Sequence, residues 1–132
     1  MGAWGVGIFE NDDASDWVAG LEGQNTIQPV VSSLRGAGAE GYLEASGSCV
    51  ALVAAEVVAA LNGNPAASLP KEVTNWVRSH QLQINEDLVR LALQAIHRVE
   101  TQSELLELWQ ESEELDGWVA TIRDLERRLG IA

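Results

Sequence analysis

Apolar residues recur at helical spacing along nearly the whole chain. Ala14, Trp17, Val18 and Leu21 fall at positions i, i+3, i+4 and i+7, so they share one face of a helix. Six later segments repeat this spacing, and none shows the strict alternation of apolar and polar residues that is typical of a strand. The pattern predicts an all-α protein folded as a compact, irregular bundle of about six to seven helices.

Capping residues and glycines mark where the helices begin and end. Six of the expected helices open at residues that suit a helix N-terminus, namely Asn11, Thr26, Ser68 with Pro70, Asn85, Ser103 and Ser112. Glycine follows the last expected turn of four helices, at Gly23, Gly36, Gly63 and Gly130. These signals predict short links between the helices and no long linker.

The longest helical run, residues 42–62, is apolar nearly all round, which predicts a central helix surrounded by the others. Glu56 interrupts this run, and a carboxylate in an apolar helix must be paired, protonated or at an exposed edge. We predict a structural role for Glu56, in which it pairs with an arginine or satisfies neighbouring backbone groups. A functional role for a perturbed carboxylate is the alternative.

Composition and charge narrow the class of protein. The chain has 132 residues, 46% of them hydrophobic, which suits one domain spanning residues 1–132. Its net charge of −12 argues against binding nucleic acid or an anionic membrane and permits a basic protein partner. The single cysteine, Cys49, excludes an intramolecular disulfide, and we expect it to be buried and inert. With no signal peptide and no bilayer-spanning run, we expect a cytoplasmic protein of undetermined oligomeric state.

Signatures of catalysis are absent from the sequence. There is no GxSxG, no GxxxxGK[ST], no HExxH and no CxxC. His80 and His97 lie far apart and are expected at the surface. We therefore name no catalytic residue and no cofactor, and we favour a non-enzymatic protein.

Asp12, Asp13 and Asp16 are the candidate metal ligands. Asp12 and Asp16 are four residues apart, so both carboxylates share one face of a helix, and oxygen clusters of this kind bind hard divalent cations. Two of these acids also suit the positive end of a helix dipole, and no second acidic cluster is spaced to complete a coordination shell. A divalent-cation site is thus an alternative to a purely structural explanation.

An acidic pattern in the last third of the chain is the candidate partner-binding surface. Seven acids and no base lie between Arg98 and Arg123. Five of the acids step by four and three residues and would form a stripe on one unbroken helix: Glu100, Glu104, Glu107, Glu111 and Glu114. Helix breaks at Ser103 and Ser112 would divide the stripe and turn some of these acids into favourable first-turn residues.

The N-terminal segment carries the most distinctive pattern. Residues 1–10 interleave glycines with Trp4, Ile8 and Phe9, and we expect an extended arm packed against the body. The segment resembles a bacterial domain-of-unknown-function family, number 4259, which begins MGxWGxGxFxNDxAxDW. The residues that carry the resemblance are Gly2, Trp4, Gly5, Gly7, Phe9, Asn11, Asp12, Ala14, Asp16 and Trp17.

Similarity to this family continues at Glu56 within residues 54–61, at residues 69–70 and 103–109, and near Trp118. At position 117, beside Trp118, the resemblance leads us to expect a helix-forming residue, and this chain has glycine instead. The resemblance implies a stand-alone bacterial module without an established activity or cofactor, and it transfers no catalytic residue.

Charge, size and absent catalytic motifs favour a protein-interaction module that binds a basic partner, as immunity or inhibitor proteins do. The alternative is a metal- or small-ligand-binding protein, or an enzyme, that uses Asp12, Asp13 and Asp16. A structural subunit of a homo-oligomer is a third hypothesis.

Overall fold

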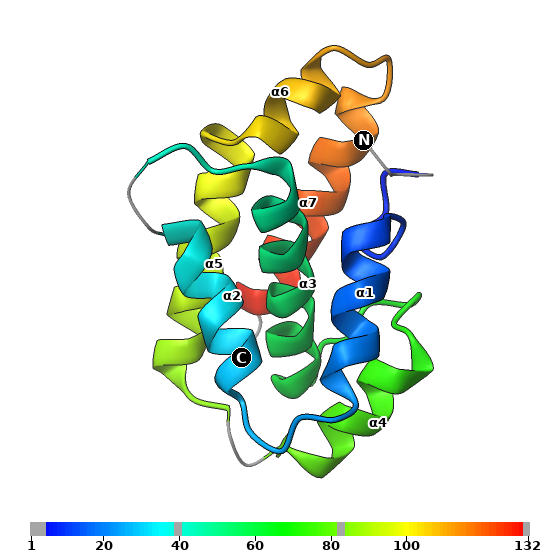
Figure 1. The fold of residues 1–132 in the computed structure, drawn as a ribbon, viewed down its shortest axis with the longest axis vertical. Helices are drawn as coiled ribbons and strands as arrows, with labels where there is room; N and C mark the ends of the chain where they lie inside the picture. Colours follow the sequence, from blue (N-terminus) through cyan, green and yellow to red (C-terminus); the bar gives the residue numbers. More distant parts are fainter. Residues whose placement is uncertain (1–4, 39–40, 82–83, 131–132) are drawn as a thin grey trace.

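The structure, a computed structural model, describes residues 5–38, 41–81 and 84–130 (Figure 1). These ranges contain seven α-helices and no strand. The helices are α1 (Asp12–Leu21), α2 (Gln28–Gly38), α3 (Ala45–Leu61), α4 (Lys71–Ser79), α5 (Glu86–Thr101), α6 (Glu104–Gln110) and α7 (Leu115–Gly130). The predicted all-α bundle of six to seven helices is confirmed.

Helix α3 forms the centre of the bundle (Figure 1). Thirteen of its 17 residues are buried, and it contacts every other helix. Small side chains such as Ser48, Ala55 and Ala59 are fully enclosed, which lets the neighbouring helices approach the α3 backbone closely. The prediction of a central, surrounded helix from its uniform hydrophobicity is confirmed.

Two tryptophans tie peripheral elements together through their indole N–H groups. Trp17 of α1 donates to the Ser33 hydroxyl of α2 over 2.9 Å. Trp76 of α4 donates to the Gln24 carbonyl, 3.0 Å away in the link between α1 and α2. Each ring adds apolar area to the core while its one polar atom is satisfied, as a buried tryptophan requires.

Most predicted helix ends are confirmed. The side chains of Asn11, Asn85 and Ser103 accept hydrogen bonds from the backbone N–H groups three residues later, at 2.8, 2.8 and 3.1 Å. Thr26 likewise accepts from the Gln28 N–H at 3.3 Å, and α7 ends at Gly130 as predicted.

Three predicted boundaries are wrong. Helix α2 continues past Gly36 to Gly38, because Ala37 is buried against the core. Helix α3 begins at Ala45 rather than residue 42, and the residues before it place Leu43 in the core between exposed Tyr42 and Glu44. Ser112 caps a turn through the Glu114 N–H, and α7 begins only afterwards.

The sequence predicts an extended N-terminal arm, but its described part, residues 5–10, closes into a turn instead. The Glu10 N–H donates to the Gly7 carbonyl at 3.0 Å, and the Glu10 carboxylate accepts from the Gly7 N–H at 3.1 Å. A Cβ atom on Gly5 or Gly7 would lie 2.3 Å from a Glu10 carboxylate oxygen. These two glycines therefore leave the space in which the Glu10 carboxylate lies. Trp4 is outside the described residues.

A buried ion pair joins the middle of α3 to the end of α7. The Arg128 guanidinium donates to both Glu56 oxygens, at 2.7 and 2.9 Å, and both side chains are less than a tenth exposed. The predicted pairing of Glu56 with an arginine is confirmed. Such a bidentate contact is short, directional and strong in a low-dielectric interior.

Arg128 also holds the polypeptide around this pair. It donates to Asp124, one turn earlier, at 2.8 Å and to the Asn64 carbonyl at 3.3 Å, while the Asn64 amide donates to the Arg128 carbonyl at 3.0 Å. Burial by itself lowers the pKa of Arg128, but the hydrogen bonds and charges of Glu56 and Asp124 outweigh it and raise that pKa. Arg128 therefore stays charged in the core.

We expect Arg128→Met to lower the free energy of unfolding by about 3–5 kcal/mol, because it leaves the Glu56 carboxylate buried without a counter-charge. The double variant Glu56→Met, Arg128→Met is expected to lose less than Arg128→Met alone. Urea unfolding followed by circular dichroism measures both. Arg127→Met is the control, because it removes an exposed ion pair with Asp124 on the same helix and is expected to cost under about 1 kcal/mol. Equal losses at positions 127 and 128 would contradict a structural role for the buried pair.

Gly117 lies in the first turns of α7, and a Cβ there would be 3.7 Å from the Val6 methyl groups, an ordinary van der Waals distance. Gly117→Ala is therefore expected to stabilise the protein by about 0.5–1 kcal/mol through helix propensity. Gly20→Ala in α1, where a Cβ meets nothing within 4 Å, controls for propensity alone. If only the Gly117 variant lowers the melting temperature, the added methyl group clashes with the Val6 side chain and the expectation is wrong.

Candidate interaction surface

The N-terminus of α6 is bound to the segment that enters α3. The Glu104 N–H donates to the Leu43 carbonyl at 2.9 Å, and the Glu104 carboxylate accepts from the Ala45 N–H at 2.7 Å. Helix α3 has no cap from its own N-cap residue, Glu44. Glu104 thus caps α3 from a position 59 residues later in the sequence and fixes the segment against α6.

Tyr42 stands on this fixed segment and is the large hydrophobic side chain that the described part of the chain leaves exposed, at 63%. Its hydroxyl donates to Glu107 Oε2 at 2.8 Å. That hydrogen bond, then slight desolvation and the charges of Glu107, Glu104 and Glu44, raise the pKa of Tyr42 to about 12. The phenol is therefore neutral at all physiological pH values, with an exposed ring and a hydroxyl held in place.

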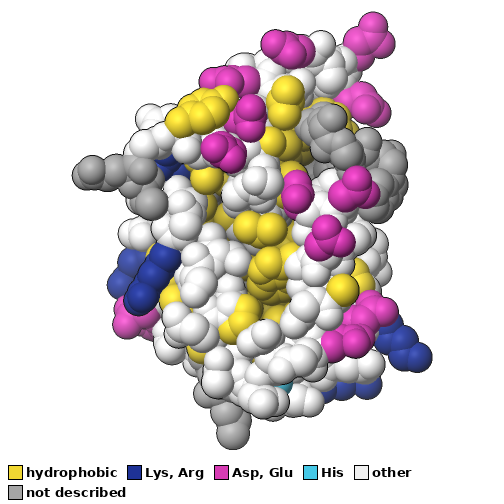
Figure 2. All heavy atoms as spheres, in the orientation of Figure 1, with side chains coloured by type: hydrophobic (Ala, Val, Ile, Leu, Met, Phe, Trp, Pro, Cys, Tyr) yellow, Lys and Arg dark blue, Asp and Glu magenta, His cyan; other side chains and the backbone are white. Residues whose placement is uncertain are grey.

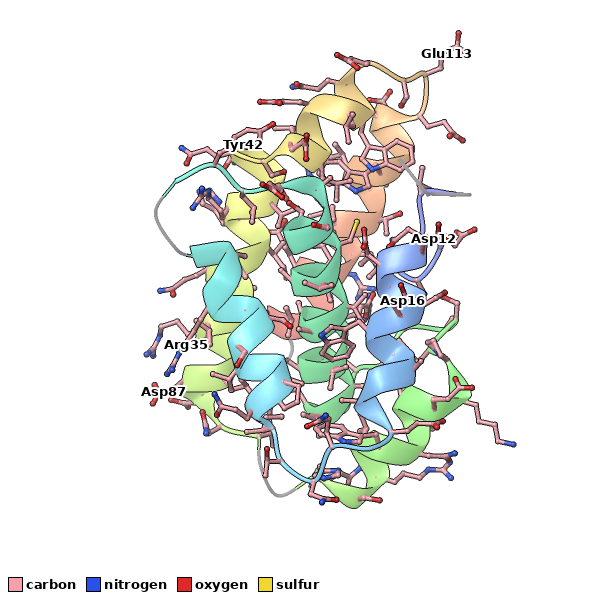
Figure 3. The ribbon with its side chains drawn as sticks, viewed as in Figure 1. Asp12, Asp16, Arg35, Tyr42, Asp87 and Glu113 are labelled. Atoms are coloured by element: carbon pink, nitrogen blue, oxygen red, sulfur yellow. The ribbon has the colours of Figure 1, made fainter. Side chains whose placement is uncertain are left out.

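Acidic side chains lie beside this segment, along α6, in the turn after α6 and in the first turn of α7. We define the acidic end as Glu44, Glu104, Glu107, Glu111, Glu113, Glu114 and Asp116. Figure 2 shows acidic side chains concentrated in the upper part of the molecule, with lysine and arginine mainly lower and at the sides. Glu113 projects from the tip in Figure 3. On this face of the molecule, the acidic side chains are densest at the end that carries α6.

The predicted stripe is divided by the two helix breaks. Glu100 is half-buried on α5, Glu104 and Glu107 lie on α6, and Glu111 and Glu114 belong to the turn that follows. Glu104 accepts a hydrogen bond from the Ala45 N–H, and Glu107 accepts one from the Tyr42 hydroxyl. Glu111 and Glu114 are exposed, and their carboxylates make no hydrogen bond or ion pair within the described residues.

Sequence reasoning missed Tyr42 and Glu44 because it assigned both to the central helix. The signal that distinguishes them is the local alternation of exposed Tyr42, buried Leu43 and exposed Glu44 immediately before the apolar run. Three residues are too few for such a pattern to be recognised without the fold.

A hollow of about 430 Å³ opens beside Tyr42, between the segment before α3 and the junction of α5 with α6. Its lining is mostly polar and includes Thr101, Gln102, Glu107 and Gln110. Arg98 also lines it, with its guanidinium donating to the carbonyls of residues 37, 41 and 102. The hollow is open and lacks the apolar lining of a small-molecule pocket.

Asp12, Asp13 and Asp16 lie along α1, with Asp12 and Asp16 exposed and one turn apart (Figure 3). Within residues 5–38, 41–81 and 84–130, no three His, Cys, Asp or Glu side chains gather closely enough to hold a metal ion. Glu10, the other nearby acid, is turned back onto Gly7. The structure thus adds no support to the divalent-cation hypothesis, which stays a prediction.

The other candidate chemical groups are accounted for by packing. Cys49 is buried, and desolvation together with the charge of Asp13 raises its pKa to about 11, which makes the thiol unreactive near neutral pH. His80 is half-buried at the end of α4 with its ring stacked on Trp76, the two centroids 3.9 Å apart. His97 is exposed on α5, as predicted.

The comparisons with known proteins give a family and nothing more. The model of a family described as a domain of unknown function (DUF4259) matches residues 2–121, so the chain belongs to this family, as its N-terminal residues predicted. No curated protein and no solved structure matches the chain. Among the described residues, no helix combines the length and hydropathy that crossing a membrane requires.

The chain has one tyrosine, so tyrosinate absorbance reports Tyr42 alone. In pH-jump stopped-flow measurements, which precede alkaline unfolding, we expect a midpoint of about 12. Glu107→Gln removes the largest cause of the shift and is expected to move the midpoint toward 10. Glu113→Gln, at the exposed tip, is expected to leave it nearly unchanged. A wild-type midpoint near 10 would show that the hydroxyl does not bind Glu107.

Proposed function

We propose that this member of the DUF4259 family is a non-enzymatic protein-interaction module that binds a basic protein through its acidic end, in the manner of immunity or inhibitor proteins. The observation that carries the proposal is the position of Tyr42, a 63% exposed aromatic ring held among Glu44, Glu104 and Glu107. Tyrosine is enriched at the energetic centres of protein interfaces because its ring packs while its hydroxyl bonds.

The arrangement fits a surface that is already organised before binding. Glu104 fixes the segment that carries Tyr42, and Glu107 fixes the orientation of its hydroxyl. A partner would then bind without having to order these side chains, and this reduces the entropic cost of association. The free acids Glu111, Glu113 and Glu114 follow α6 at the same end of the molecule, with Glu113 at its tip (Figure 3), and supply the long-range attraction that accelerates encounter with a basic surface.

Some acids of the acidic end are hydrogen-bonded within the fold and others are exposed, and only the exposed ones can be substituted without disturbing the fold. Glu104 is unsuitable, because replacing it also removes the cap of α3. The triple variant Glu111→Gln, Glu113→Gln, Glu114→Gln removes three charges from exposed carboxylates that make no hydrogen bond or ion pair within the described residues. A matched control, Asp12→Asn, Asp16→Asn, Glu22→Gln, removes three exposed charges from α1 and its C-cap residue.

We expect the purified protein to retain a basic partner from the lysate of its own source at low salt and to release it at about 0.5 M salt, as screening predicts. The triple variant and Tyr42→Ala are each expected to lower recovery by about tenfold, while the α1 control matches the wild type. Mass spectrometry of equal amounts of bait measures recovery. Retention that is insensitive to salt, or an equal loss with the α1 control, would contradict binding through the acidic end.

A further inference from the structure

Two carboxyl groups meet where α5 packs against α7. Glu100 of α5 and Glu126 of α7 are both half-buried and lie within hydrogen-bonding range of each other. Glu100 Oε2 is buried, and no donor in the described structure reaches it. A buried carboxylate oxygen without a donor is costly, so this atom requires an explanation.

Two ionised carboxylates cannot satisfy each other, because each only accepts hydrogen bonds. When one of them is protonated, its O–H donates to the other, and the repulsion between two like charges disappears. We propose that Glu100 and Glu126 share one proton across the α5–α7 contact and that its loss at rising pH loosens α7, so that the pair acts as a pH-sensitive latch. The proton gives a hydrogen-bond donor to the Glu100 carboxylate, whose Oε2 has no other donor.

The surroundings of Glu126 raise its pKa into the neutral range, as a shared proton requires. The hydrogen bond with Glu100, then desolvation, then the charge of Glu100 raise the pKa of Glu126 from 4.5 to about 7, against a smaller opposing effect of Arg123. The folded protein thus binds this proton more tightly than the unfolded chain. The pair contributes most to stability below about pH 4.5, and the contribution is lost as the pH rises through about 7.

The other charged groups near this contact do not neutralise the pair. Arg123, one turn earlier on α7, is the base that acts on Glu126, and it is exposed. On α5, His97 is exposed and Arg98 is directed to backbone carbonyls. On the helices next to α7, Glu56 binds Arg128, Glu104 binds the Ala45 N–H and Glu107 binds Tyr42, while Glu86 and Asp87 lie in the first turn of α5, at the opposite end of that helix from Glu100. On α7 itself, Asp124 pairs with Arg127 and Arg128.

Glu126→Gln tests the latch, because the glutamine amide donates to Glu100 at every pH. Melting temperatures of the full chain are compared at pH 5.5, 7.0 and 8.5 with EDTA present, so that no cation bridges the carboxylates. The difference between Glu126→Gln and wild type is expected to grow with pH and to reach about 3 °C in favour of the variant at pH 8.5. Taking the difference cancels the contribution of other titrating groups, the two histidines included.

Glu100→Gln is expected to show the same pH-dependent gain, and the double variant no more than either single one, because all three remove the same repulsion. Glu113→Gln is the charge-matched control, and its difference from wild type is expected to be constant over this range. A Glu126→Gln difference that is as constant as the control would overturn the proposal.

Carbon-13 NMR of the glutamate carboxyl groups gives a second readout that needs no variant to be stable. One carboxyl resonance is expected to titrate with a midpoint near 7 and to be missing from Glu126→Gln. If every glutamate carboxyl in the wild-type protein titrates below about pH 5.5, no proton is shared and the latch does not exist. This outcome leaves binding at the acidic end unaffected, since Glu100 and Glu126 are not part of that surface.

Discussion

Glu56 lies in the middle of the most buried helix, and its charge can be kept there only with an oppositely charged partner. Arg128 meets this requirement from the last turns of α7, across 72 residues of sequence. Because the guanidinium also binds Asn64 and Asp124, the register of α7 against α3 is fixed at one point.

The acidic residues of the chain serve two distinct purposes. Glu56, Glu104 and Glu107 each accept hydrogen bonds from groups that the fold brings to them, so they hold α7, the start of α3 and Tyr42 in place. Glu111 and Glu113 remain in solvent, where a negative charge is available to another molecule. Some of the acids behind the net charge of −12 therefore stabilise the fold, and others are exposed at the surface. Only the exposed charges are available to attract a partner.

The residues that identify the family have mainly structural explanations where the structure describes them. Gly5 and Gly7 leave space for the Glu10 carboxylate, Asn11 caps α1, and Trp17 joins α1 to α2. Nothing in the described contacts explains why Asp16 belongs to the signature, since its side chain is exposed. Most of the signature residues that the structure describes thus serve to fold the N-terminal segment onto α1, and Asp16 is the acid without such a structural role.

The sequence by itself determined the number and type of the elements, because helical periodicity, the caps at Asn11, Asn85 and Ser103, and the uniform hydrophobicity of α3 are local properties. It also determined that Glu56 needs a partner. Only the tertiary structure decided that this partner is Arg128, that Glu104 caps α3, and that Tyr42 is exposed among acids. The physical reason is that each of these contacts joins residues about 60 or more positions apart, and periodicity carries no information about which distant groups meet.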